Sequence, residues 1–175
     1  AGLLHDIGKP FCKLRDGNSF NHPIEGEILA KNALLSLKAP KKVVVETAEL
    51  VRLHMYDFDG KTSEKKLRRF LVEHAPILEK LLLVKQADFS GCKDDPSPCP
   101  TVRRWTELLA RMKEEKVPFS LKELKVRGDD LLSLGIPKEK ISCLLRELLL
   151  HCANSPKENE KEHLLLLVSR KRGRD

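Results

Sequence analysis

Apolar residues recur at steps of three and four along most of this chain, which is the spacing of an α-helix. No two-residue hairpin turn separates alternating segments, so strands are not indicated. The pattern therefore predicts an all-α fold. Helices are predicted from Pro23 to about Ala39, from Ser63 (with the serine as cap), from Pro76, and over residues 41–55, 101–116, 129–134, 138–152 and 156–171.

The sequence pattern of the first residues is typical of the middle of a helix. The chain opens Ala1-Gly2-Leu3-Leu4, with neither a methionine nor a capping residue before this apolar segment. We therefore expect His5 and Asp6 to lie on a helix, and we expect the sequence to be a piece of a longer polypeptide.

Composition changes sharply between residues 91 and 100. The last five of these residues contain three prolines, which a helix interior does not tolerate. This predicts a helical core over residues 1–90, a proline-rich linker over 91–100, and a small helical tail module over 101–175.

The overall composition restricts the class of protein. The chain has 175 residues, 41% of them apolar, and a net charge of +7. No apolar run approaches the roughly 18 residues that a membrane helix needs, and no leader with a cleavage site is evident. The five scattered cysteines are odd in number and lack metal-type pairing, so a disulfide framework or a zinc finger is disfavoured. We expect a cytoplasmic protein without a membrane partner.

Five side chains suggest a metal site: His5, Asp6, His22, His54 and Asp88. An adjacent His-Asp pair alone is more typical of a core histidine beside a solvated carboxylate. Asp88, however, shares a predicted helix face with apolar residues, and a buried carboxylate is costly unless it is paired or binds metal. The alternatives are that Asp88 caps the loop at Gly91 and that His54 is a packed histidine. Imidazole and carboxylate together suit Mn, Fe, Co, Ni or Zn, with Mg as a further possibility.

The order of these residues resembles a known family. Residues 3–10 (LLHDIGKP) resemble the signature of the HD superfamily of metal-dependent phosphohydrolases. Residues 20–26 (FNHPIEG) and 51–55 (VRLHM) are similar to the HD region of bacterial tRNA nucleotidyltransferases, that is, CCA-adding and poly(A) polymerase-like enzymes. Residues 86–91 (QADFSG) resemble the final Asp segment of that region, and residues 127–137 resemble the tRNA-contacting tail module.

The resemblance implies roles for the candidate residues. Asp6 would bridge two metals, His22 and His54 would complete the second site, and His5 and Asp88 would serve the first. A further histidine ligand of the first site would lie upstream of residue 1. A metal-bound water would act as a nucleophile, so Asp6 and Lys9 are the catalytic candidates. Lys9 is placed to reach a phosphate oxygen, although a solvated lysine explains it equally well.

The tail is the candidate RNA-binding region, with tRNA or another structured RNA as the expected partner. Lys122, Lys125 and Arg127 precede Gly128, where a helix N-terminus would favour a phosphate. Basic residues also crowd the end of the chain, where they are equally typical of a tail that aids solubility: Arg170, Lys171, Arg172 and Arg174.

These observations lead to one main interpretation. We interpret the chain as the HD-domain and tail portion of a tRNA nucleotidyltransferase-like protein that binds divalent metal and positions tRNA. Its N-terminal nucleotidyltransferase head is expected to be missing from this sequence, so the chain alone should not add nucleotides. The alternatives are a metal-dependent phosphohydrolase acting on 2′,3′-cyclic phosphates, nucleotides or phosphate monoesters, and a degenerate helical scaffold.

Overall fold

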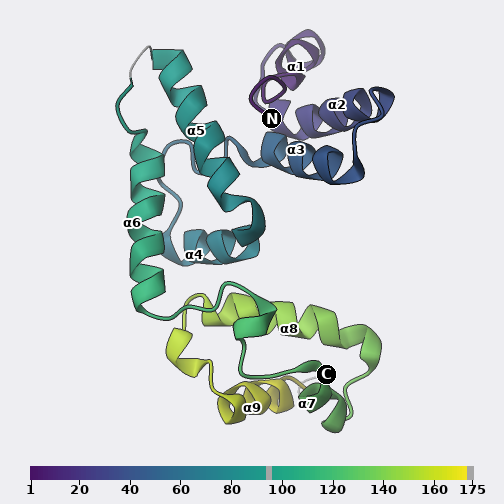
Figure 1. Ribbon diagram of the computed structural model, residues 1–175, viewed down its shortest axis with the longest axis vertical. Coiled ribbons are helices and arrows are strands. Elements are labelled where there is room, and N and C mark those ends of the chain that lie inside the picture. The colour runs from purple at the N-terminus through teal and green to yellow at the C-terminus, as the bar shows by residue number, and fades with distance from the viewer. Residues whose placement is uncertain (94–95, 173–175) are drawn as a thin grey trace. The chain divides into compact units, whose positions relative to one another are not determined.

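The computed structural model describes residues 1–93 and 96–172, and the secondary structure in these ranges is helical throughout (Figure 1). The predicted all-α fold is confirmed. No helix in the described ranges has both the length and the apolar character needed to cross a bilayer. The helices are α1 Gly8–Asp16, α2 His22–Ser36, α3 Lys41–Leu53, α4 Glu64–Glu73, α5 Leu78–Lys93, α6 Pro100–Glu114, α7 Gly128–Ser133, α8 Lys138–Cys152 and α9 Lys161–Arg172, with short 3-10 helices at Ala75–Ile77, Leu121–Glu123 and Pro156–Glu158.

The chain forms two compact units whose limits differ from the predicted division. Unit 1 contains Ala1–Lys61 and Pro76–Arg104, and unit 2 contains Thr62–Ala75 and the described residues from Trp105 onward. Helix α4 therefore packs with the tail, although it lies within the predicted core. Helix α6 begins in unit 1 and continues into unit 2.

Unit 1 is built around α2, which packs against both α1 and α3. Its core includes Cys12, Ala30, Val51 and Leu81, all fully buried. Helix α5 closes the same unit from a distant part of the sequence and contacts α3. These four helices carry or flank every predicted metal ligand.

Gly8 permits the close approach of α1 to α2. A Cβ atom at this position would lie 2.3 Å from the backbone oxygen of His22 and 2.8 Å from the backbone nitrogen of Gly26. Both neighbours are backbone atoms, so they cannot move aside as a flexible side chain would. The absence of a side chain at Gly8 therefore brings residues 5–8 next to the start of α2.

The predicted helix at the chain start is wrong. Residues 2–7 form successive turns, and α1 begins only at Gly8. Their hydrogen bonds span three residues, from Leu4 N to Ala1 O (2.8 Å) and from Ile7 N to Leu4 O (3.2 Å). Such turns place every third residue on one side, as a helix does, so the apolar spacing alone did not distinguish the two structures.

Other helix limits also differ from the prediction. Helix α3 ends at Leu53 instead of Met55, and a turn follows. Helix α5 begins at Leu78, after a 3-10 helix that includes Pro76, and continues through Gly91 to Lys93. Helix α6 then begins at Pro100, because proline is tolerated in the first turn of a helix. Ser63 precedes α4 as predicted, but its side chain makes no capping hydrogen bond.

Unit 2 packs α4 and α6–α9 around Trp105, which is fully buried and lies 5.4 Å from the Phe70 ring. The buried Arg68 donates from Nε to the Ala153 oxygen (2.6 Å) and pairs with Glu115. The predicted helix over 156–171 is interrupted at Asn159. Its side chain instead accepts from Lys125 N and donates to Glu123 O, both at 3.0 Å, so it satisfies the backbone of a neighbouring segment.

Candidate functional site

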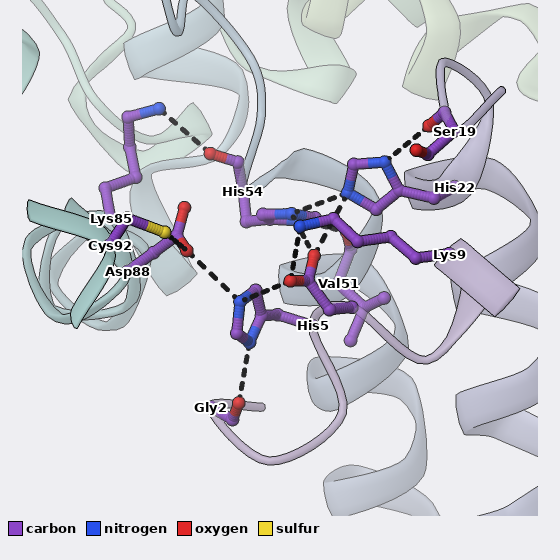
Figure 2. Close-up of polar contacts among 11 residues, drawn as sticks. Gly2, His5, Lys9, Ser19, His22, Val51, His54, Lys85, Asp88 and Cys92 are labelled. Carbon is purple, nitrogen blue, oxygen red and sulfur yellow. Dashed lines mark hydrogen bonds and ion pairs between the residues drawn. The ribbon is translucent and has the colours of Figure 1, made fainter.

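Four elements of unit 1 bring the five predicted metal ligands together in one cluster, called here the His–Asp cluster (Figure 2). His5 and Asp6 lie in the turns before α1, His22 is the first residue of α2, and His54 follows the last residue of α3. Asp88 lies on α5.

Asp6 lies at the centre of this cluster. Its Oδ1 is 3.3 Å from His22 Nε2 and 3.9 Å from His54 Nε2, while its Oδ2 is 3.4 Å from His5 Nε2. The two carboxylate oxygens therefore face different histidines. His5 Nε2 is also 3.2 Å from Asp88 Oδ1. The arrangement has two halves that share Asp6.

The rings of all three histidines are oriented by the same kind of hydrogen bond to the backbone. Each Nδ1 bonds to the carbonyl oxygen three residues earlier: His5 to Gly2 (2.7 Å), His22 to Ser19 (2.7 Å) and His54 to Val51 (2.6 Å). A carbonyl oxygen only accepts hydrogen bonds, so Nδ1 is the donor in each case, and in the neutral form of each ring the Nε2 that faces the cluster is unprotonated. Metal-binding histidines are commonly oriented by such second hydrogen bonds.

His22 and His54 bring two of these nitrogens together inside the protein. Their Nε2 atoms are 3.2 Å apart, and the two residues are 5% and 2% exposed. Two lone pairs at this distance repel each other unless a proton or a metal ion shares them. Burial lowers the pKa of His54 from 6.5 to about 4, so the ring is neutral near pH 7 and its lone pair is free to coordinate.

Asp6 is held in its charged form. Burial acts to raise the pKa of Asp6, but the hydrogen bond from Lys9 and the neighbouring positive groups outweigh it and lower the pKa. Lys9 Nζ lies 2.5 Å from Asp6 Oδ2, and its side chain is 44% exposed. The Lys9 ammonium is thus at the cluster and also accessible to solvent.

Asp88 is less buried than its predicted apolar face suggests, with 26% of the side chain exposed. The residue lies near the C-terminal end of α5, and its Oδ1 accepts a hydrogen bond from the exposed Cys92 thiol at 3.5 Å. The carboxylate is nevertheless paired with His5, and it does not cap a loop at Gly91, because α5 continues through that residue.

The described residues contain one compact set of donor atoms that suits a single metal ion. One ligand atom from each of Asp6, His22 and His54 lies within 4.8 Å of the others. Two imidazole nitrogens and a carboxylate oxygen suit a borderline divalent metal, and three protein ligands leave coordination positions for water or substrate. His5 and Asp88 form the less buried half of the cluster.

Two features that support the cluster were not predicted from the sequence. Lys85 on α5 is 6% exposed and donates to the backbone oxygens of His54, at the end of α3, and of Tyr56, in the turn that follows. Asp57, in the turn after His54, has a fully buried carboxylate that accepts from Arg104 Nη1 at 2.7 Å. A lysine or aspartate is ordinarily taken as solvent-exposed, so the sequence carries no clear signal for either role.

The predicted RNA-binding residues lie on a groove of unit 2 with a volume of about 980 Å³. Lys122, Lys125 and Arg127 line it, and Gly128 follows as the first residue of α7. At this helix N-terminus, where a phosphate contact is predicted, one protein carboxylate already bonds to the backbone. Asp130 accepts from Arg127 N at 2.8 Å and pairs with Lys161 at 2.5 Å.

The basic residues at the chain end are only partly described. Arg170 is exposed on α9. The side chains of Lys171 and Arg172, and the whole of Arg174, lie outside the described residues. The structure therefore describes the basic side chains of the groove but not most of those at the chain end.

Comparison with known proteins gives two kinds of match. Residues 1–89 match the HD domain family. A CC-adding tRNA nucleotidyltransferase of Thermus thermophilus is 36% identical over 94 residues, which are 50% of this chain and 21% of that protein. An A-adding tRNA nucleotidyltransferase of Deinococcus radiodurans is 31% identical over 161 residues, which are 85% of this chain and 36% of that protein. No solved structure matches the chain.

These matches agree with the geometry of unit 1. The family match spans every residue of the His–Asp cluster, and the chain spans little more than a third, at most, of the length of either relative. The resemblance to bacterial tRNA nucleotidyltransferases inferred from the motifs is confirmed at this level. The chain belongs to the HD domain family.

Proposed function

We propose that this chain is the HD and tail portion of a tRNA nucleotidyltransferase-like protein, in which unit 1 holds a divalent metal and unit 2 positions tRNA. The observation that carries the metal assignment is the convergence of the buried Nε2 atoms of His22 and His54 on Asp6. The names of the two relatives support tRNA as the partner. The proposal assigns nucleotide addition to a separate head domain, because the relatives are much longer than this chain.

The donor set favours particular metals and a particular site. Asp6 Oδ1, His22 Nε2 and His54 Nε2 would hold the first ion, since they form the most compact set of donors. Imidazole nitrogen favours Mn, Fe, Co, Ni or Zn over Mg, which prefers oxygen ligands. His5 and Asp88, with Asp6 Oδ2, would serve a second ion.

The second candidate function is that of a metal-dependent phosphohydrolase. The position of the Lys9 ammonium beside Asp6 favours it. A divalent metal bound here would acidify a coordinated water and neutralise phosphate charge. The half-exposed Lys9 ammonium adds a positive charge beside Asp6, where a phosphate oxygen would lie. Asp6 fixes this ammonium, so one carboxylate would orient both the ligand set and the phosphate contact.

The groove of unit 2 supports the tRNA assignment. It is lined by more basic than acidic side chains, and one of the acidic ones, Glu115, is paired with Arg68. Clustered lysines neutralise phosphates and release counterions, which gives affinity that falls with salt. The basic lining residues are Lys113, Lys116, Lys122, Lys125, Arg127 and Lys157.

We expect the double substitution Lys122→Glu/Lys125→Glu to weaken tRNA binding about tenfold or more. Each lost phosphate contact should reduce the salt slope of the binding constant by about 1. Arg127 is left intact because its guanidinium also donates to the Leu121 oxygen. The measurement is titration of labelled tRNA at several salt concentrations.

The matched control for this experiment is Lys138→Glu/Lys140→Glu. These lysines are exposed on α8 of the same unit and do not line the groove. The control makes the same change in net charge, so the proposal predicts a smaller loss of affinity. Equal losses in the two variants, or binding that ignores salt, would contradict a specific role for the groove.

A further inference from the structure

Lys85 is a buried cation directed at the end of α3. It is 6% exposed, and its ammonium donates to the backbone oxygen of His54 at 2.9 Å (Figure 2). It also donates to the backbone oxygen of Tyr56 at 2.8 Å. Lysine is almost never buried to this degree unless it is paired. Its position therefore reflects a specific bonding role.

One of the carbonyl groups that Lys85 binds belongs to His54, the C-cap of α3, and needs a partner from outside that helix. The last carbonyls of a helix have no intrahelical donor, and cations near a helix C-terminus are stabilising. The residues that follow form turns, and Asp57 adopts a left-handed conformation with a φ of 56°. Lys85 thus ties down the segment on which the His54 imidazole is mounted.

The same turn of α5 contacts both halves of the His–Asp cluster. Asp88, three residues after Lys85, pairs with His5, while Lys85 holds the backbone of His54. Burial lowers the pKa of Lys85, and the nearby negative groups, including Asp57 and Asp88, act in the opposite direction. The buried cation is thus offset by carboxylates of the same unit.

We propose that Lys85 is a positioning residue for the metal ligand His54. By holding the His54 and Tyr56 carbonyls, it fixes the backbone from which the His54 ring projects and so directs Nε2 toward Asp6 and His22. This inference rests on the proposed metal-binding function. It adds a residue from outside the ligand set that sets the geometry of the set.

The test compares Lys85→Met with Lys80→Met. Methionine keeps an unbranched apolar stem and removes the ammonium. Lys80 also links α5 to α3, through Glu46 at 2.5 Å, but this pair is exposed and lies outside the cluster. Calorimetric titration of metal-stripped protein with Mn²⁺ should show about 10- to 100-fold weaker binding in Lys85→Met, as for other residues that orient a ligand, and near wild-type binding in Lys80→Met.

A second readout needs no metal. Long-range ¹H–¹⁵N NMR spectra report which ring nitrogen of His54 carries the proton. Lys85→Met should shift the His54 ring signals, whereas Lys80→Met should leave them unchanged. A merely structural role for Lys85 would lower the unfolding midpoint but leave both the Mn²⁺ affinity of the folded protein and the His54 signals as in the wild type, and this result would overturn the inference.

The outcomes separate the two proposals. If wild-type protein binds no Mn²⁺, the proposed function fails, and the His54 signals still decide the role of Lys85. If the wild type binds Mn²⁺ and Lys85→Met binds equally well, the positioning role alone is refuted. If Lys85→Met does not fold, Lys85→Leu, which likewise removes the donor, is judged by the same two criteria.

Discussion

Replacing Asp6 by asparagine should weaken divalent-metal binding by about 100-fold or more, beyond the roughly 10- to 100-fold cost of losing a residue that only orients a ligand. Asparagine keeps the shape of the side chain but removes its charge and one of its two acceptor oxygens. Because Oδ1 faces His22 and Oδ2 faces His5, one substitution affects both halves of the cluster. Calorimetric titration with Mn²⁺, Co²⁺ and Ni²⁺ measures the loss.

Asp16→Asn is the matched control for this substitution. Asp16 lies at the end of α1 and pairs with Arg15, outside the His–Asp cluster. It should retain wild-type metal affinity. If both variants bind equally, the carboxylate of Asp6 is not a ligand. The same pair of variants tests the phosphohydrolase alternative, because metal-dependent hydrolysis of 2′,3′-cyclic AMP by the wild type should be lost only in Asp6→Asn.

Gly8→Ala should lower the free energy of unfolding by about 3 kcal/mol, near the upper end of overpacking costs. The added Cβ would meet the His22 oxygen at 2.3 Å and the Gly26 nitrogen at 2.8 Å, and both atoms belong to the backbone of α2. Relief therefore requires α1 and α2 to separate, which would also displace His22. Urea unfolding followed by circular dichroism measures the change.

Gly91→Ala should change the free energy of unfolding in the opposite direction. Gly91 lies within α5, and nothing lies within 4 Å of the position of its Cβ atom. Alanine in a helix interior should stabilise the protein by up to about 1 kcal/mol relative to glycine. A Gly8→Ala protein as stable as the wild type would contradict the close approach of α1 and α2.

The helical fold was predictable because most helices have clear sequence boundaries. Helix α8, for example, spans the predicted residues 138–152, directly after Pro137. The break before α9 was not predictable, because it depends on Asn159 bonding to the backbone of residues 123 and 125, which are distant in sequence. The turns at residues 2–7 share the three-residue spacing of a helix, and pattern alone did not separate them.

The residues that gather at the candidate site were predictable from the sequence, but the hydrogen bonds that hold them in place were not. The order His5-Asp6, His22, His54 and Asp88 identified the cluster, and the structure brings all five together. The carbonyl partners of the three histidines depend on local backbone geometry, and the contact of Lys85 with His54 joins α5 to α3. Neither relationship has a signature in residue type or spacing.

The histidine rings of the wild-type protein give the most direct test of the metal site. Three of the six histidines lie in the cluster, and the other three, His74, His151 and His163, lie in unit 2. Substoichiometric Mn²⁺ should broaden the ring ¹H–¹⁵N signals of His22, His54 and His5 and leave the other three sharp. Unchanged spectra, or equal broadening of all six rings, would contradict a metal site at Asp6.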